Sequence, residues 1–207
     1  MSSSSESKVS TEQIKELRER TGAGILECKK ALQETGGDLE KAILILRAKG
    51  ASMATEKAGR EARQGLVGAY VHSGRIGVLV EINCETDFVA RTEEFKNFVN
   101  EICLQIASMN PQYVSRDDVP PEQISTALEQ LHEQIEGAED EGAQAMQQSY
   151  MEKFYREIVL LDQPYVRDNS KNIQDLLHDS VTSLRENIVI RRFIRYVLGE
   201  KLPESNP

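Results

Sequence analysis

The side chains that could carry out bond-making chemistry are few and widely spaced. The chain has three cysteines and three histidines: Cys28, Cys84, Cys103, His72, His132 and His178. They include no CxxC pair and no spacing typical of metal ligands. The nucleotide-binding pattern GxxxxGK[ST] is absent from the sequence as well. We therefore expect no catalytic residue, no metal site and no cofactor, and we expect the cysteines to be buried free thiols in a reducing compartment.

One short stretch, NCETDFVAR at residues 83–91, places a carboxylate beside a large aromatic ring. Thr86 and Asp87 are typical of a helix start, where the hydroxyl and the negative charge satisfy the first N–H groups and the helix dipole. Phe88, Phe95 and Ile102 are seven residues apart, so one continuous helix would bury Phe88 with them in the core. The alternative is a ring that projects toward a partner. The pattern of residues leaves both possibilities open.

A second mixed cluster lies near the C-terminus, where Arg191, Arg192 and Arg195 alternate with Phe193 and Tyr196. Basic and aromatic residues together are a weak indication of nucleic-acid binding. Charges along an exposed edge strand explain the same pattern, because they prevent edge pairing. The net charge of −9 disfavours binding to nucleic acid or to an anionic membrane, and no apolar run approaches the roughly 18 residues of a membrane span. We expect neither partner.

Three short helices are predicted over residues 10–50, with glycine-containing turns between them. Ser10 and Gln13 form a capping box, Asp38 caps the third helix and Gly50 ends it. The polar residues 1–9 are predicted to be a disordered tail. Residues 51–65 carry alanine at every fourth position and are predicted to form a linker helix.

The period of the apolar residues changes after the linker. The sequence LVGAYVHSGRIGVLVEIN, from residue 66 to residue 83, contains two β-branched runs around Ser73-Gly74 and predicts a hairpin. Further helices are predicted after Thr86, from Glu122 to about Leu161 and over 172–185, and a last strand is predicted over 186–200. The first of these helices carries Phe95, Phe98, Val99, Ile102 and Ile106 on one face. This order predicts an α+β fold, with a helical N-terminal domain and a core domain over residues 66–202.

Four blocks of the sequence resemble the translation elongation factor Ts family. They are ELRERTGAGILECKKAL (16–32), GRIGVLVEINCETDFVAR (74–91), LLDQPYVRD (160–168) and ENIVIRRFIRYVLGE (186–200). The blocks occur in the family's order from about residue 8 to residue 202. The resemblance implies an N-terminal three-helix module like a ubiquitin-associated domain, followed by an α+β dimerisation core in which helices flank a small antiparallel sheet.

The same resemblance implies a guanine nucleotide exchange factor that promotes GDP release from elongation factor Tu during translation elongation. It implies a location in the bacterial cytoplasm or an organelle interior. In this family the stretch matching Thr86, Asp87, Phe88 and Val89 contacts the GTPase. The phenylalanine wedges between two helices of the GTPase, and the neighbouring region disturbs its Mg²⁺ and phosphate site. Such a factor needs no catalytic residue of its own and is not an enzyme.

The family's N-terminal module also docks on the GTPase, which implies a second contact surface at Arg18, Ile25 and Leu26. The family commonly has two methionines where this chain has Ile25 and Leu26. Short members of the family can form dimers. No cysteine follows Cys103, so we expect any homodimer to be non-covalent.

The sequence leaves three other functions open beside nucleotide exchange. The first is an adaptor whose helical module binds ubiquitin-like proteins or peptides. The second is an RNA-binding accessory protein that uses the arginines near the C-terminus. The third is a small thiol enzyme at Cys84.

Overall fold

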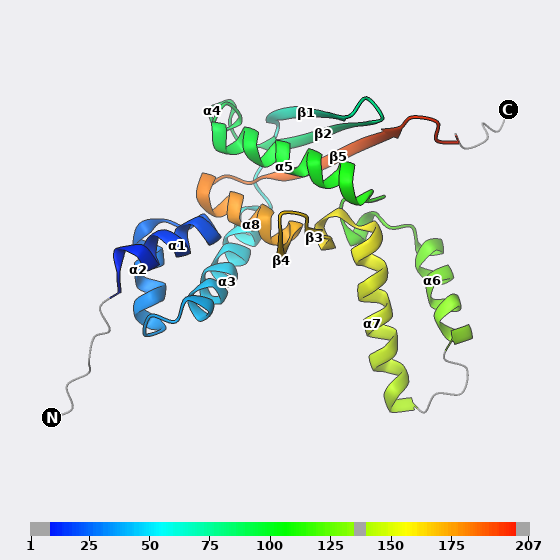
Figure 1. Ribbon diagram of the computed structural model, residues 1–207, viewed down its shortest axis with the longest axis horizontal. Helices are drawn as coiled ribbons and strands as arrows, with labels where there is room; N and C mark the ends of the chain where they lie inside the picture. The colour runs from blue at the N-terminus through cyan, green and yellow to red at the C-terminus, as the bar shows by residue number, and fades with distance from the viewer. Residues whose placement is uncertain (1–8, 135–139, 202–207) are drawn as a thin grey trace. The chain divides into compact units, whose positions relative to one another are not determined.

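The computed structural model describes residues 9–134 and 140–201 (Figure 1). The predicted disordered tail therefore lies, apart from residue 9, outside the described residues. The chain divides into two compact units. The first consists of Met1–Leu66, Ile82–Phe98 and Asp175–Val189, and the second of Val67–Glu81, Val99–Gln174 and Ile190–Pro207.

The first unit begins with the three predicted helices, α1 (Thr11–Thr21), α2 (Ile25–Glu34) and α3 (Leu39–Lys57). The capping box of α1 is present, since the Ser10 hydroxyl accepts from Gln13 N at 3.1 Å and Gln13 Oε1 accepts from Ser10 N at 3.0 Å. The apolar stripes of the helices meet in a common core that includes Leu17, Cys28, Ala31, Leu32, Ala42, Ile43 and Leu46. The three helices and the capping box are confirmed.

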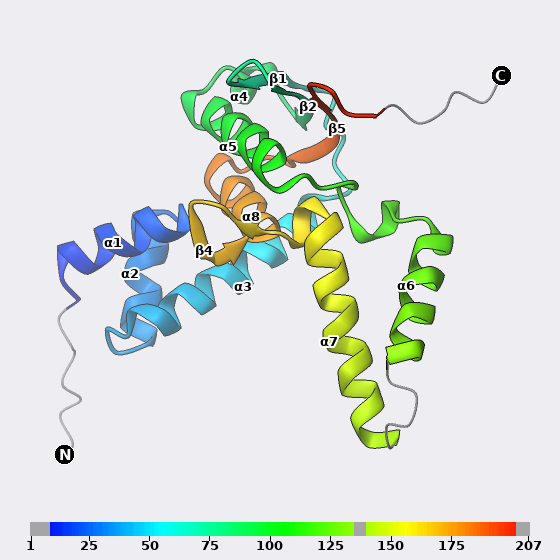
Figure 2. The same ribbon diagram turned by 45° about the vertical axis from the view of Figure 1, so that its right-hand side comes forward.

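The third helix is longer than predicted, because α3 continues through Gly50 to Lys57. The prediction that Gly50 ends this helix is wrong, and residues 51–57 belong to α3. Gly50 is buried against α8 (Ile173–Leu184), which lies beside α3 in Figures 1 and 2. A Cβ atom on Gly50 would lie 3.0 Å from Thr182 Oγ1. The glycine therefore allows two helices to approach closely. The domain boundaries themselves remain predictions.

A three-stranded sheet has the order β1–β2–β5, formed by β1 (Gln64–His72), β2 (Ile76–Cys84) and β5 (Val189–Val197). Ser73 and Gly74 both have positive φ, at 50° and 67°, as tight hairpin turns require. Leu198 N donates to Arg75 O, and the Arg192 guanidinium donates to Glu81. These pairings make β5 antiparallel to β2. The predicted hairpin and the α+β fold with an antiparallel sheet are confirmed.

Helix α5 (Glu93–Met109) runs along the sheet (Figures 1 and 2). Gly68 of β1 permits this approach, because a Cβ atom there would lie 2.3 Å from Val99 Cγ1 and 3.1 Å from Cys103 Sγ. The predicted apolar face of this helix is buried at all five positions: Phe95, Phe98, Val99, Ile102 and Ile106.

The rest of the second unit contains α6 (Pro121–Gln134), α7 (Asp140–Ile158) and the antiparallel pair β3 (Pro164–Tyr165) and β4 (Asp168–Asn172). Arg116 anchors the C-terminal end of α7 by donating to Glu152 at 2.9 Å and to Asp162 at 2.9 Å. Its guanidinium also lies 4.5 Å from the centre of the Tyr155 ring. These contacts raise the pKa of Arg116 and lower the pKa of Glu152.

Candidate functional site

The stretch from Glu85 to Thr92, which we call the tip, connects the end of β2 to the start of α5. It contains one helical turn, α4 (Asp87–Ala90). The Thr86 hydroxyl caps this turn by accepting from Val89 N at 3.3 Å. The Thr92 hydroxyl then accepts from Phe95 N at 3.2 Å, at the start of the next helix. The tip is thus a capped turn followed by a second capped helix.

Phe88 points away from the core, with 80% of the residue exposed. That is the highest exposed fraction of any large apolar residue in the described parts of the chain. Burial of Phe88 with Phe95 and Ile102, one of the two possibilities left open by the sequence, is wrong. The chain changes direction at Arg91 and Thr92 between α4 and α5, so the helical period does not extend from Phe95 back to Phe88.

The four residues assigned to the tip by resemblance divide into an exposed group and a buried one. Thr86, Asp87 and Phe88 are exposed. Val89 is only 8% exposed and Ala90 4%. The buried Val89 side chain anchors the turn to the core. The outer surface of the tip therefore consists of the Thr86, Asp87 and Phe88 side chains. Asp87 also forms an exposed ion pair with Arg91 at 2.8 Å.

Glu186, which sequence reasoning missed, lies directly behind the tip. Its carboxylate accepts from Glu85 N and Thr86 N, both at 3.0 Å, and from the Thr86 hydroxyl at 2.6 Å. The two segments are 100 residues apart in sequence. No periodicity or local spacing signals this pairing, because nothing in either segment specifies its distant partner.

Cys84 lies directly under the tip, and its thiol donates to Thr86 O at 3.2 Å. Burial, and to a smaller extent the Glu186 charge, raise the pKa of Cys84 to about 11. A thiol with this pKa is almost entirely protonated near neutral pH and is a poor nucleophile. This weighs against the thiol-enzyme alternative. The three cysteines are buried and free, as predicted.

The second surface assigned by resemblance lies at the start of α2. Ile25 is 56% exposed and Leu26 73% exposed, and Arg18 of α1 is exposed as well. Glu27 fixes this helix start, because its carboxylate accepts from Gly24 N at 3.1 Å. Leu44 of α3 is also exposed, at 63%, and it is not among the residues assigned by resemblance.

The arginines near the C-terminus are engaged by their own chain. Arg192 donates to Glu81 at 2.7 Å, and Arg191 pairs with the same carboxylate at 3.7 Å. Arg195 donates to Asn110 Oδ1 at 3.0 Å. These contacts favour the structural interpretation of the cluster over RNA binding.

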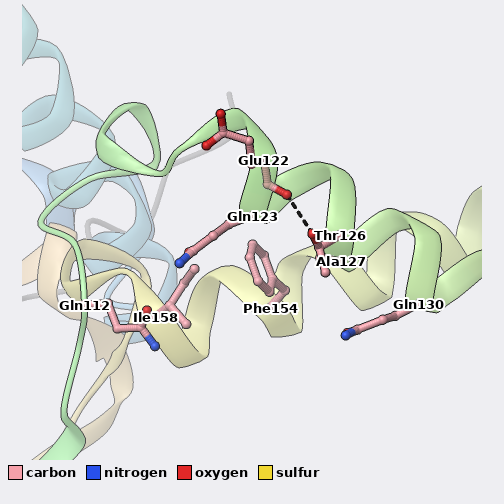
Figure 3. Close-up of a pocket in the computed structure, with 8 residues that line it drawn as sticks. All are labelled: Gln112, Glu122, Gln123, Thr126, Ala127, Gln130, Phe154 and Ile158. Carbon is pink, nitrogen blue, oxygen red and sulfur yellow. Dashed lines mark hydrogen bonds between the residues drawn. The ribbon is translucent and has the colours of Figure 1, made fainter. Parts of the chain in front are cut away.

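Pockets and clusters elsewhere in the described residues offer little chemistry. A cavity of about 360 Å³ lies between α6 and α7 (Figure 3), where its lining residues are Gln112, Glu122, Gln123, Thr126, Ala127, Gln130, Phe154 and Ile158. Glu122 is the one titratable residue of this lining, so the cavity holds no acid–base pair. Within residues 9–134 and 140–201 no cluster of His, Cys, Asp or Glu could hold a metal ion. None of the helices in these two ranges combines the length and the hydropathy that a membrane span requires.

Comparison with known proteins identifies the family. The family described as Elongation factor TS matches residues 12–200. A protein named Elongation factor Ts from Thermoanaerobacter sp. (strain X514) is 55% identical over 201 residues, which cover 96% of this chain and 98% of that protein. The protein of the same name from Thermodesulfovibrio yellowstonii is 46% identical over 197 residues, covering 95% and 99%. The chain belongs to the elongation factor Ts family of translation factors.

Proposed function

We propose that this protein is a guanine nucleotide exchange factor that binds elongation factor Tu and accelerates the release of GDP. The observation that carries the proposal is the exposure of Phe88 on a capped turn. A phenylalanine side chain gains roughly 1.5–3 kcal/mol when it leaves water for an apolar site. A ring that remains largely exposed in its own chain keeps most of this gain for contact with a partner.

The proposed mechanism requires differential binding and no bond-making residue. Phe88 inserts between two helices of the GTPase, and Thr86 and Asp87 lie against the region that holds Mg²⁺ and phosphate. Because Mg²⁺ is often the largest local charge in such a site, disturbing it weakens the hold on GDP. GDP and this protein then weaken each other's binding to the GTPase by the same factor. A coupling free energy of ~3 kcal/mol corresponds to an affinity lowered about 150-fold.

The burial of Val89 supports a narrower set of contact residues within this proposal. The resemblance placed it among the contact residues, but its side chain is buried. We therefore assign contact with the GTPase to Thr86, Asp87 and Phe88, and support of the turn to Val89. Arg18, Ile25 and Leu26 form the proposed second docking surface, and we place the protein in the cytoplasm or organelle interior where translation occurs.

The exchange mechanism is tested by measuring the affinity of this protein for two forms of elongation factor Tu. Calorimetric titration should give about 100-fold tighter binding to the nucleotide-free form than to the GDP-bound form. Equal affinity for both forms would contradict the proposed mechanism, because a ligand that binds two states equally cannot shift the equilibrium between them.

Asp87→Ala is expected to lower the rate of GDP release by about tenfold, the effect of losing one charged hydrogen bond to the partner. The melting temperature should hardly change, because the exposed Asp87–Arg91 pair contributes at most about 1 kcal/mol. Arg91→Ala is the matched control, since it breaks the same pair and leaves the carboxylate in place. If both variants lose the same activity, Asp87 acts only through Arg91.

We also propose that a second copy of this chain covers the outer face of the sheet. Val67, Leu79 and Ile194, one from each strand, are exposed there at 69%, 47% and 43%, and they line a shallow pocket of about 390 Å³. At its border the paired Glu81 and Arg192 provide both charges that a self-complementary surface needs.

Leu79→Glu is expected to convert the dimer to a monomer, because it would bury a charge in the interface. Sedimentation equilibrium measures the change, with Leu44→Glu on the exposed surface of α3 as the control that should leave the dimer intact. A parent protein that stays monomeric across the accessible concentration range would rule out the dimer.

A further inference from the structure

Among the described residues outside the tip, Glu186 provides the largest set of hydrogen bonds to it. One carboxylate oxygen accepts from two successive backbone N–H groups, those of Glu85 and Thr86, and the other accepts from the Thr86 hydroxyl. Hydrogen bonds to an ionised acceptor are about twice as strong as those between neutral groups. A single side chain after α8 therefore fixes the backbone at the point where the chain leaves β2.

The contact with the hydroxyl also sets the orientation of the helical turn. Thr86 has one hydroxyl proton, and it points to Glu186 at 2.6 Å. The lone pairs of the same oxygen are then free to accept from Val89 N at 3.3 Å. Glu186 thus holds Thr86 in the orientation that caps α4. Phe88 is a residue of this turn, so its direction depends on the cap.

The next residue, Asn187, also forms a hydrogen bond with the start of the tip. Asn187 N donates to Glu85 Oε1 at 2.7 Å, and Asn187 Nδ2 donates to Arg60 O at 2.7 Å. Asn187 is only 5% exposed. Hydrogen bonds therefore run both ways between the two segments: the tip donates to Glu186, and Asn187 donates to the tip. This reciprocal pairing holds the start of the tip in one conformation.

The segment that holds the tip also contacts the N-terminal helices. Arg185 ends α8 with a positive φ of 58°, and its guanidinium lies 3.3 Å from Glu27 Oε1. Glu27 belongs to the first turn of α2, next to Ile25 and Leu26. Two consecutive side chains, Arg185 and Glu186, thus reach the two surfaces proposed to contact the GTPase.

We propose that Glu186 is a positioning residue, which holds the tip in one orientation relative to the N-terminal helices so that both surfaces meet the GTPase together. The inference rests on the proposed exchange function. A preorganised tip binds without the cost of ordering it on contact. Loss of Glu186 is then expected to impair the insertion of Phe88 more than the initial docking.

The test compares Glu186→Ala, Glu186→Gln and Glu129→Ala, the last being an exposed glutamate on α6 that serves as the control. In the free protein, amide hydrogen exchange of residues 85–91 should be about tenfold faster in Glu186→Ala, the effect of losing charged hydrogen bonds. The glutamine keeps an acceptor for the two N–H groups, so its hydrogen exchange should be intermediate. Glu129→Ala should match the parent.

The second readout separates positioning from a purely structural role. With elongation factor Tu, Glu186→Ala should lower the maximal rate of GDP release by about tenfold, while the concentration for half-maximal effect changes little. Unchanged hydrogen exchange at the tip would show that Glu186 does not hold it. Faster hydrogen exchange with a normal release rate would show that orientation of the tip does not matter. Both results would overturn the proposal.

Two further outcomes also bear on the proposal. If Glu186→Ala fails to fold, the same comparison is made with Glu186→Gln, which keeps the shape of the side chain, and unaltered tip exchange and release in that variant would again overturn positioning. If the parent does not accelerate GDP release, the exchange function fails, and the positioning role in exchange fails with it. The hydrogen-exchange comparison in the free protein then still decides whether Glu186 anchors the tip.

Discussion

Phe88→Ala should reduce the maximal rate of GDP release from elongation factor Tu by about 100-fold, as expected for loss of an aromatic anchor worth ~3 kcal/mol. The ring is 80% exposed in the free chain, so its removal leaves no cavity behind. The backbone of the turn is held by Thr86 and Glu186, whose contacts do not involve the ring. Exchange should therefore fall while the melting temperature stays within one or two degrees, as for a typical surface substitution.

The matched control for this variant is Phe95→Ala, seven residues further along the chain. Phe95 is fully buried, and truncating a buried phenylalanine costs about 3–5 kcal/mol. Stopped-flow release of fluorescent GDP and thermal unfolding are measured on both variants. Phe88→Leu should retain part of the activity because it keeps an apolar group. Strong destabilisation by Phe88→Ala, similar to that of Phe95→Ala, would mean that the ring supports the fold and is not a wedge.

Gly65→Ala is expected to be the most damaging alanine substitution among the glycines that the structure describes, at about 3 kcal/mol or more of unfolding free energy, because both strain and overlap oppose it. Gly65 has a φ of +141°, a backbone conformation that residues other than glycine rarely adopt. A Cβ atom there would lie 2.0 Å from Ile82 O and 2.8 Å from Asn83 Cα. Both contacts are to backbone atoms, so no side-chain rotation relieves them, and β1 and β2 must separate locally.

This separation would act on the tip through the chain, since Ile82 and Asn83 come directly before Cys84 and Glu85. Thermal unfolding and GDP release should therefore both be impaired in Gly65→Ala. Gly77→Ala is the control within the same sheet, because a Cβ atom at Gly77 meets nothing within 4 Å. The expectation fails if the two glycine variants have equal stability.

The elements that the sequence predicted correctly are specified by local signals. The capping box at Ser10 and Gln13, the turn at Ser73-Gly74 and the apolar face of α5 all depend on residues a few positions apart. Local preference and final structure agree at these places, as they do in most of a foldable sequence.

The failed prediction for Gly50 and the missed contacts of Glu186 both involve residues that are distant in sequence. Gly50 would end an isolated helix readily, because glycine is a poor helix former, but packing against α8 outweighs that preference. The orientation of Phe88 was left open by the sequence, and the turn at Arg91 and Thr92, between α4 and α5, leaves the ring exposed. The contacts of Glu186 with the tip cross 100 residues, and no pattern within either segment could have indicated them.

The resemblance and the structure therefore contributed different parts of the candidate site. The resemblance assigned partner contact to residues 86–89, and it included Val89 among the contact residues. The structure separates exposed Phe88 from buried Val89 and adds the anchor behind them. Physical reasoning from the residues alone left the orientation of Phe88 undecided.

The central proposal, that this protein accelerates GDP release, is tested most directly by one kinetic measurement. Elongation factor Tu is loaded with a fluorescent GDP, excess unlabelled GDP is added, and the signal is followed at increasing concentrations of this protein. The proposal predicts a release rate that rises with concentration to a plateau far above the spontaneous rate. A rate equal to the spontaneous one at every concentration, with the protein folded and an active GTPase from a matching source, would contradict it.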